Sequence, residues 1–66
     1  MTEKEKELIL KCFCESRRTQ AFYSNCLTED ISEEGREFLL ELVQETAKTS
    51  NKIKDYCMEV YRRNNE

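Results

Sequence analysis

Residues 28–35, with the sequence TEDISEEG, decide the fold because they interrupt an otherwise continuous helical pattern. Their short polar side chains compete with a helix backbone for hydrogen bonds, which favours a turn. Asp30 or Ser32 is a suitable N-cap for a following helix, and Glu33 and Glu34 suit the positive end of its dipole. The stretch therefore predicts a turn at about 28–32 and a second helix that begins near residue 33.

The residues before this turn predict a helix over about 3–27. Thr2 and Glu5 have the spacing of a capping box, in which each side chain bonds to the backbone N–H of the other residue. Apolar residues then recur at the three-and-four spacing of one helical face. They include Ile9, Cys12, Phe13, Tyr23, Cys26 and Leu27.

The residues after the turn predict a helix over about 33–62, whose apolar seam runs from Leu39 to Val60 in heptad-like steps. Because the connection is only a few residues long, the two helices must be antiparallel. With a turn centred near Asp30, residue i of the first helix is expected to lie level with about residue 60 − i of the second. The chain is thus predicted to be one all-α domain, 1–66, folded as an antiparallel helical hairpin.

Each predicted helix also carries apolar residues away from its seam, and two helices cannot bury two faces each. We therefore expect the hairpin to complete a four-helix bundle by homodimerisation. The residues predicted to form the packed and intersubunit surfaces are Phe13, Phe22, Tyr23, Phe38, Leu40, Leu42, Ile53 and Val60.

Four cysteines in 66 residues raise the question of disulfides or metal binding. The expected register places Cys12 level with Lys48 and more than about 10 Å along the axis from Cys57, which argues against an intramolecular disulfide. We expect Cys12, Cys26 and Cys57 to fill core positions as small apolar residues. The alternative is that these three thiols bind a soft metal. Cys14 falls on the outer face of the first helix and is the candidate for an intermolecular crosslink. The sequence predicts no cofactor.

A polar stretch interrupts the middle of both seams, at Ser16, Thr46, Thr49 and Ser50. The simplest interpretation is that the hydroxyls bond back to the backbone of their own helices and allow the helices to pack closely. A polar layer that sets the register, or a groove for a partner, is the alternative.

The composition excludes several classes of function. The chain has no histidine, which removes the commonest general base, and its single glycine cannot build a phosphate-binding loop. Charged residues make up 38% of the chain while the net charge is only −3, so no single-sign field favours nucleic acid or a membrane surface. We expect a cytoplasmic protein that is not an enzyme.

The order of features resembles the coat F domain, a family of short helical domains in spore coat proteins. That family opens with an acidic residue and a lysine, then a leucine-rich run, and has a basic residue six positions before a tyrosine. Here these are Glu5-Lys6, Leu8 to Leu10, Arg17 and Tyr23; Glu29, Arg36, Leu39 and 42–45 continue in register. The resemblance covers about 4–55. Gly35 replaces the leucine expected before the arginine, and the closing Gly-Trp-Tyr of the family is absent.

This resemblance implies a structural protein of the spore coat with a ferritin-like helical fold. Family members often hold two hairpins in one chain, so a single hairpin would obtain its other half by dimerising. Two other interpretations remain open. The chain would be a regulator that presents Phe22, Phe38 and Leu40 to a protein partner, or a protein that binds metal through cysteine thiolates.

Overall fold

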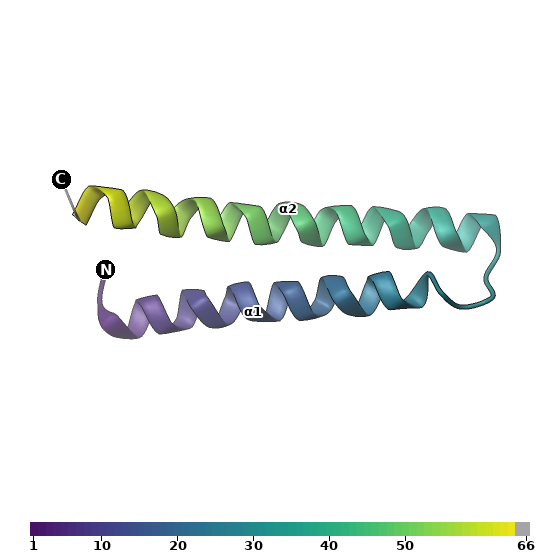
Figure 1. The fold of residues 1–66 in the computed structure, drawn as a ribbon, viewed down its shortest axis with the longest axis horizontal. Coiled ribbons are helices and arrows are strands. Elements are labelled where there is room, and N and C mark those ends of the chain that lie inside the picture. The colour runs from purple at the N-terminus through teal and green to yellow at the C-terminus, as the bar shows by residue number, and fades with distance from the viewer. Residues whose placement is uncertain (65–66) are drawn as a thin grey trace.

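The computed structural model describes residues 1–64 as two helices joined by a short loop. Helix α1 (Glu3–Cys26) and helix α2 (Glu33–Asn64) run antiparallel and pack along their length (Figure 1). The chain is therefore an all-α helical hairpin, as the sequence predicts. Helix α1 ends one residue earlier than expected and α2 continues two residues further. The last two residues of the predicted domain, 65–66, lie outside the described residues.

The capping box that the sequence predicts begins α1. The hydroxyl of Thr2 accepts the backbone N–H of Glu5 at 3.1 Å, and the Glu5 carboxylate accepts the backbone N–H of Thr2 at 3.3 Å. The Thr2 hydroxyl also donates to the same carboxylate oxygen at 3.0 Å. These bonds, from the Thr2 hydroxyl first and its backbone N–H second, hold the pKa of Glu5 below its usual range.

Replacing Thr2 with alanine is expected to raise the pKa of Glu5 toward the ordinary carboxyl range, because the hydroxyl that favours the charged form is lost. Since the folded pKa is lowered, the helix-stabilising effect of the pair is present above the ordinary carboxyl pKa. It is lost as the pH falls through the lowered value. An NMR titration of the Glu5 carboxyl carbon in both proteins measures this. An unchanged Glu5 titration in the Thr2→Ala protein would contradict it.

A second cap begins α2, and it is made by Ser32 rather than Asp30. The Ser32 hydroxyl accepts the backbone N–H of Gly35 at 3.1 Å, which is the bond of an N-cap residue. A Cβ at residue 35 would lie only 3.3 Å from this hydroxyl oxygen, so glycine leaves room for the capping contact.

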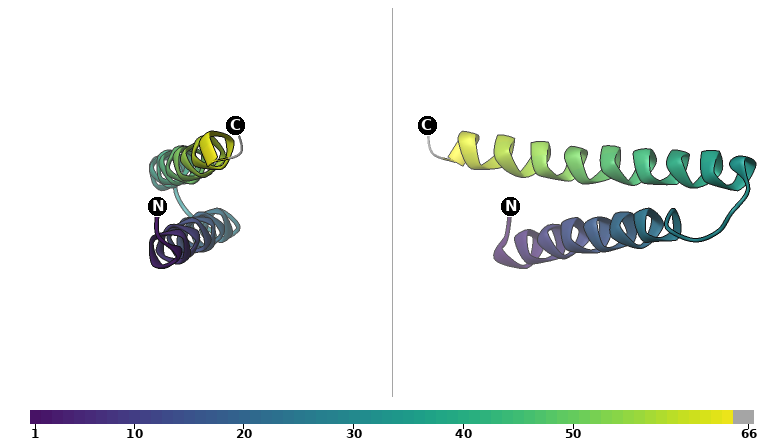
Figure 2. Two further views of the ribbon diagram at one scale, coloured as in Figure 1. Left: turned by 90° about the vertical axis from the view of Figure 1, so that its left-hand side faces the viewer. Right: turned by 45° about the vertical axis from the view of Figure 1, so that its right-hand side comes forward.

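The relative register of the helices differs from the expected one. The hydroxyl oxygens of Ser16 and Ser50 are 2.8 Å apart, so residue i of α1 lies level with about residue 66 − i of α2. The six-residue difference corresponds to roughly 9 Å along the axis. Its cause is the path of the loop, which runs past the end of α1 before it turns, so that the first turns of α2 extend beyond α1 (Figures 1 and 2). A hydrogen bond of 3.2 Å from the guanidinium of Arg36 to the Leu27 carbonyl joins this overhang to the end of α1.

The hairpin is long and flat, with dimensions of 50 × 18 × 12 Å. Its two broad faces each include both helices, and the N-terminus and the last turn of α2 lie at the end opposite the loop (Figure 1). Among residues 1–64, Val60 is the one buried apolar residue, and the other buried residue is Ser50. Neither described helix has the length and apolar character needed to cross a membrane.

Candidate interaction surface

A polar contact lies at the centre of the seam between the helices. Ser50 is completely buried, and its hydroxyl shares a hydrogen bond with that of Ser16. Ser16 donates its proton to the Phe13 carbonyl at 2.7 Å, so Ser50 is the donor between the helices. Nearby, the Thr46 hydroxyl bonds back to the carbonyls of Leu42 and Val43, within its own helix. Hydrogen bonds from hydroxyls to the backbone of their own helix thus occur beside the bond between the helices. No buried polar side-chain atom of residues 1–64 lacks a hydrogen bond.

The apolar part of the seam consists of side chains that the hairpin covers only in part. Of the predicted interface residues, Phe13, Tyr23, Leu42 and Ile53 are partly buried along this seam, and Val60 is buried. Arg17 packs over the Phe13 ring at 5.5 Å and covers part of it. These residues hold the two helices together, while most retain an exposed side.

The remaining predicted interface residues, Phe22, Phe38 and Leu40, are exposed. Phe22 is 64% exposed and touches the Tyr23 ring only edge-on, with ring centroids 6.1 Å apart. Phe22, Phe38 and Leu40 are among nine large apolar side chains of residues 1–64 that the hairpin leaves exposed to water. The set is Met1, Leu8, Leu10, Phe22, Phe38, Leu40, Tyr56, Met58 and Tyr61.

The helical geometry divides this set between the two broad faces. The angular position of each residue around its helix follows from a rotation of ~100° per residue, measured from Ser16 in α1 and from Ser50 in α2. By this measure, the residues on one side of each seam are almost all uncharged. We call this surface the cysteine face. It consists of Leu8, Cys12, Thr19, Phe22 and Cys26 of α1 with Phe38, Leu42, Thr49, Ile53 and Tyr56 of α2. Between residues 8 and 26, Glu15 is the one charged residue in the α1 row, and the α2 row has none.

The opposite broad face, which we call the basic face, carries a different set of side chains. It consists of Lys6, Leu10, Phe13, Arg17 and Gln20 of α1 with Arg36, Leu40, Ala47, Lys54, Met58 and Tyr61 of α2. Apolar side chains alternate there with four cations, and Glu33 and Arg62 lie at its edge by the same angular count. The shallow hollows at the open end of the hairpin agree with this division, since one groups Lys6 and Leu10 with Tyr61 and another groups Glu5 with Tyr56.

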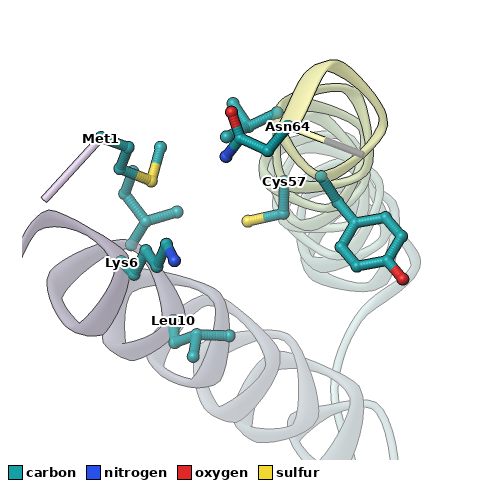
Figure 3. Close-up of a pocket in the computed structure, with 8 residues that line it drawn as sticks. Met1, Lys6, Leu10, Cys57 and Asn64 are labelled. Atoms are coloured by element: carbon teal, nitrogen blue, oxygen red, sulfur yellow. The ribbon is translucent and has the colours of Figure 1, made fainter. Parts of the chain in front are cut away.

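The larger hollow is a groove of about 380 Å³ between the helices at their terminal end, on the side of the basic face. Met1, Lys6 and Leu10 approach it from α1 and its N-terminal extension, while Cys57 points into it from α2 (Figure 3). Ile9, Val60, Tyr61 and Asn64 complete its lining. The sequence pattern does not predict this groove, because the six-residue shift in register brings Ile9 level with Cys57.

The cysteines lie at four separate places. All four are free; Cys26 and Cys57 are partly buried, whereas Cys12 and Cys14 are exposed. The exposed position expected for Cys14 agrees with the structure, and its crosslinking stays a prediction, but the core position predicted for Cys12 is wrong. A single neighbouring helix covers only a narrow strip of α1, and Cys12 lies at the edge of that strip. The expected separation of Cys12 from Cys57 is also wrong, since in the observed register they are about three residues, or roughly 4.5 Å, apart along the axis.

The described residues contain no group of three or more cysteine, histidine, aspartate or glutamate side chains that would hold a metal ion. The three cysteines considered as metal ligands are thus not brought together within one hairpin. Comparison with known proteins gives no match to a family model, a curated sequence or a solved structure. The surface of the hairpin itself is therefore the basis for a functional proposal.

Proposed function

We propose that this protein is a non-enzymatic structural protein that acts by self-association, with each hairpin supplying half of a four-helix bundle. The observation that supports this most directly is how little the hairpin buries. Val60 is the one buried apolar residue in 1–64, while two phenylalanines and several leucines are exposed. A chain of 66 residues has marginal stability even when its core is complete, so a second source of apolar burial is needed.

The resemblance to the coat F domain suggests where such a protein acts. The in-register features from Glu5 to Glu45 resemble those of the coat F domain, and four thiols in a chain without histidine suit assembly better than catalysis. We therefore propose the spore coat, reached from the cytoplasm, as its location. Protein that is equally abundant in growing and sporulating cells would argue against this part of the proposal.

The solution mass, measured by light scattering with and without reductant, tests self-association. We expect twice the chain mass of 7.9 kDa under both conditions, because the exposed apolar side chains and not the thiols form the contact. A species larger than the monomer that appears only without reductant would move the explanation to disulfide crosslinking through Cys14. A monomer under both conditions would contradict the proposal.

A second candidate function is a regulator that binds a different protein. It is favoured by the exposure of Phe22 and Phe38 on one face of the hairpin near the loop, since aromatic side chains dominate binding energy at interfaces. Leu40, the third predicted anchor, is exposed on the opposite face. A stable monomer in the mass measurement would favour this candidate, whereas burial of Phe22 and Phe38 within a homodimer would exclude it. Thiolate metal binding would require cysteines from several chains, and it fails if reduced protein takes up no copper(I) or zinc.

A further inference from the structure

We propose that the second copy binds the cysteine face and runs in the opposite direction, so that the loop of each hairpin lies beside the termini of the other. This proposal rests on the proposed self-association and adds to it the face and the orientation. Three properties of the hairpin carry it: the distribution of charge between the two broad faces, the distribution of charge along α2, and the size of the face.

The two faces differ in what a two-fold axis would bring together. In an isologous dimer each residue near the axis approaches the same surface of the partner. Through the basic face, a two-fold axis near the middle of the hairpin would bring the Arg17 guanidiniums of the two copies together, and the interface would also enclose the cations of Lys6, Arg36 and Lys54. Through the cysteine face, apolar and hydroxyl side chains would meet, with Glu15 as the one charged residue between residues 8 and 26. Enclosing charged side chains costs free energy, and like charges that meet across an interface repel, so the cysteine face, with fewer charges, is the one that a second copy covers.

The charges along α2 set the orientation. Residues 33–45 carry five acidic side chains and one basic one, whereas residues 46–64 carry five basic and two acidic ones. Helix α1 has no such asymmetry, with four acidic and five basic side chains. When the loops lie at opposite ends, α2 packs against α2 of the partner subunit, and the acidic half of each meets the basic half of the other. With the loops together, α2 would instead pack against α1 of the partner subunit, and the two acidic ends of α2 would lie at the same end of the bundle.

The charged residues that border the cysteine face on α2 agree with this pairing. Glu34 and Glu45 lie on that border in the acidic half, and Lys52 and Arg63 lie there in the basic half. A two-fold axis midway along α2, between residues 48 and 49, places Glu34 level with Arg63 of the partner subunit. The same axis places Glu45 level with Lys52 of the partner subunit. One axis therefore satisfies both pairs.

The area of the face is sufficient for a stable dimer. A broad face of 50 by 18 Å has a footprint of roughly 900 Å², close to the ~800 Å² that each partner contributes to a standard interface. The exposed rings of Phe22, Phe38 and Tyr56 lie along this face and would supply its largest apolar contacts. The apolar side chains of the basic face, Leu10 and Met58 among them, would stay at the outside of the bundle.

A distance measurement between loops tests the orientation. A spin label is attached at Thr28→Cys in a chain whose four native cysteines are replaced by alanine, with helicity checked by circular dichroism. Opposed loops predict an intermolecular distance on the order of the 50 Å length of the hairpin. Loops at the same end predict roughly 20 Å, about two helix diameters, and would overturn the orientation while leaving self-association intact. The absence of any intermolecular distance would instead contradict the proposed function.

Alkylation of the native cysteines tests the face without altering the chain. Cys12 lies on the cysteine face and Cys14 on the outside of α1, and both are exposed in the single hairpin. We expect Cys12 to react at least tenfold more slowly at concentrations at which the dimer forms than on dilution to the monomer, while the rate at Cys14 stays constant. Mass spectrometry of the modified peptides separates the two sites. If Cys12 keeps its monomer rate in the dimer, the assignment of the face is overturned.

Discussion

Replacing Ser50 with leucine is expected to lower the free energy of unfolding by roughly 2 to 4 kcal/mol, enough to unfold a hairpin of this size. Ser50 is completely buried, and its hydroxyl lies 2.8 Å from that of Ser16, so the helices leave no room for a larger side chain there. Leucine would force the helices apart and remove the interhelical bond. Urea unfolding followed by circular dichroism measures the loss.

Two controls separate overpacking from the loss of the hydrogen bond. Ser50→Ala removes the bond without adding volume and is expected to cost about 1 kcal/mol, since the Ser16 hydroxyl still bonds to the Phe13 carbonyl. Asn51→Leu places the same new side chain at an exposed neighbouring position of α2 and is expected to change stability little. All variants are compared at one protein concentration, because self-association would make stability depend on it. A Ser50→Leu protein as stable as the native one would show that this contact does not set the helix separation.

The local features of this fold could be predicted from the sequence because local chemistry determines them. The capping box of Thr2 and Glu5 and the polar stretch of the turn each act within a few residues, so the helix ends were placed to within two residues. The choice between Asp30 and Ser32 as the second cap remained open, because both side chains are able to accept the bond. The position of Gly35, three residues after Ser32, is the signal that favours the serine.

The register could not be predicted in the same way, because it depends on the path of six loop residues in space. A symmetric turn at Asp30 would give the expected pairing, but the loop continues past the end of α1 before it reverses. The positions of two serines in the sequence would have indicated the observed register. Ser16 and Ser50 are the small hydroxyl residues at the centre of each seam, and matching them with each other gives the observed register. The same shift explains why Cys57 lies beside Ile9 in the groove.

The candidate surface was predictable in composition but not in arrangement. The sequence shows that apolar residues exceed what two helices can bury, and their exposure agrees with that count. Their division between a nearly uncharged face and a basic one follows only when the seams are fixed by the Ser16–Ser50 contact. Cys12 illustrates the difference, since its spacing suits a core position and its actual environment is the edge of an open face.

Replacing Phe22 with glutamate is expected to weaken self-association at least a hundredfold while the hairpin itself stays folded. The ring is 64% exposed in the single hairpin, so its removal leaves the α1–α2 seam intact. The dimer would lose two Phe22 side chains, one from each subunit, and burial of each contributes about 1.5 to 3 kcal/mol to association. The glutamate that replaces each ring would also have to lose its hydrating water. Since 1.4 kcal/mol is a tenfold change in affinity, a hundredfold is the lower bound. Sedimentation equilibrium over a concentration series measures the shift toward monomer.

Substitutions at two leucines, one on each broad face, test which face the second copy covers. Leu8 and Leu10 are two residues apart on α1 and similarly exposed, at 51% and 58%, but they lie on the cysteine face and the basic face respectively. Leu8→Glu should therefore weaken the dimer as Phe22→Glu does, though less, because Leu8 lies near the end of the face. Leu10→Glu should leave it unchanged, because that position stays at the outside of the bundle. If Leu10→Glu weakens the dimer and both Leu8→Glu and Phe22→Glu do not, the second copy covers the basic face despite its cations. Apolar burial around the terminal groove would then outweigh the repulsion of like charges.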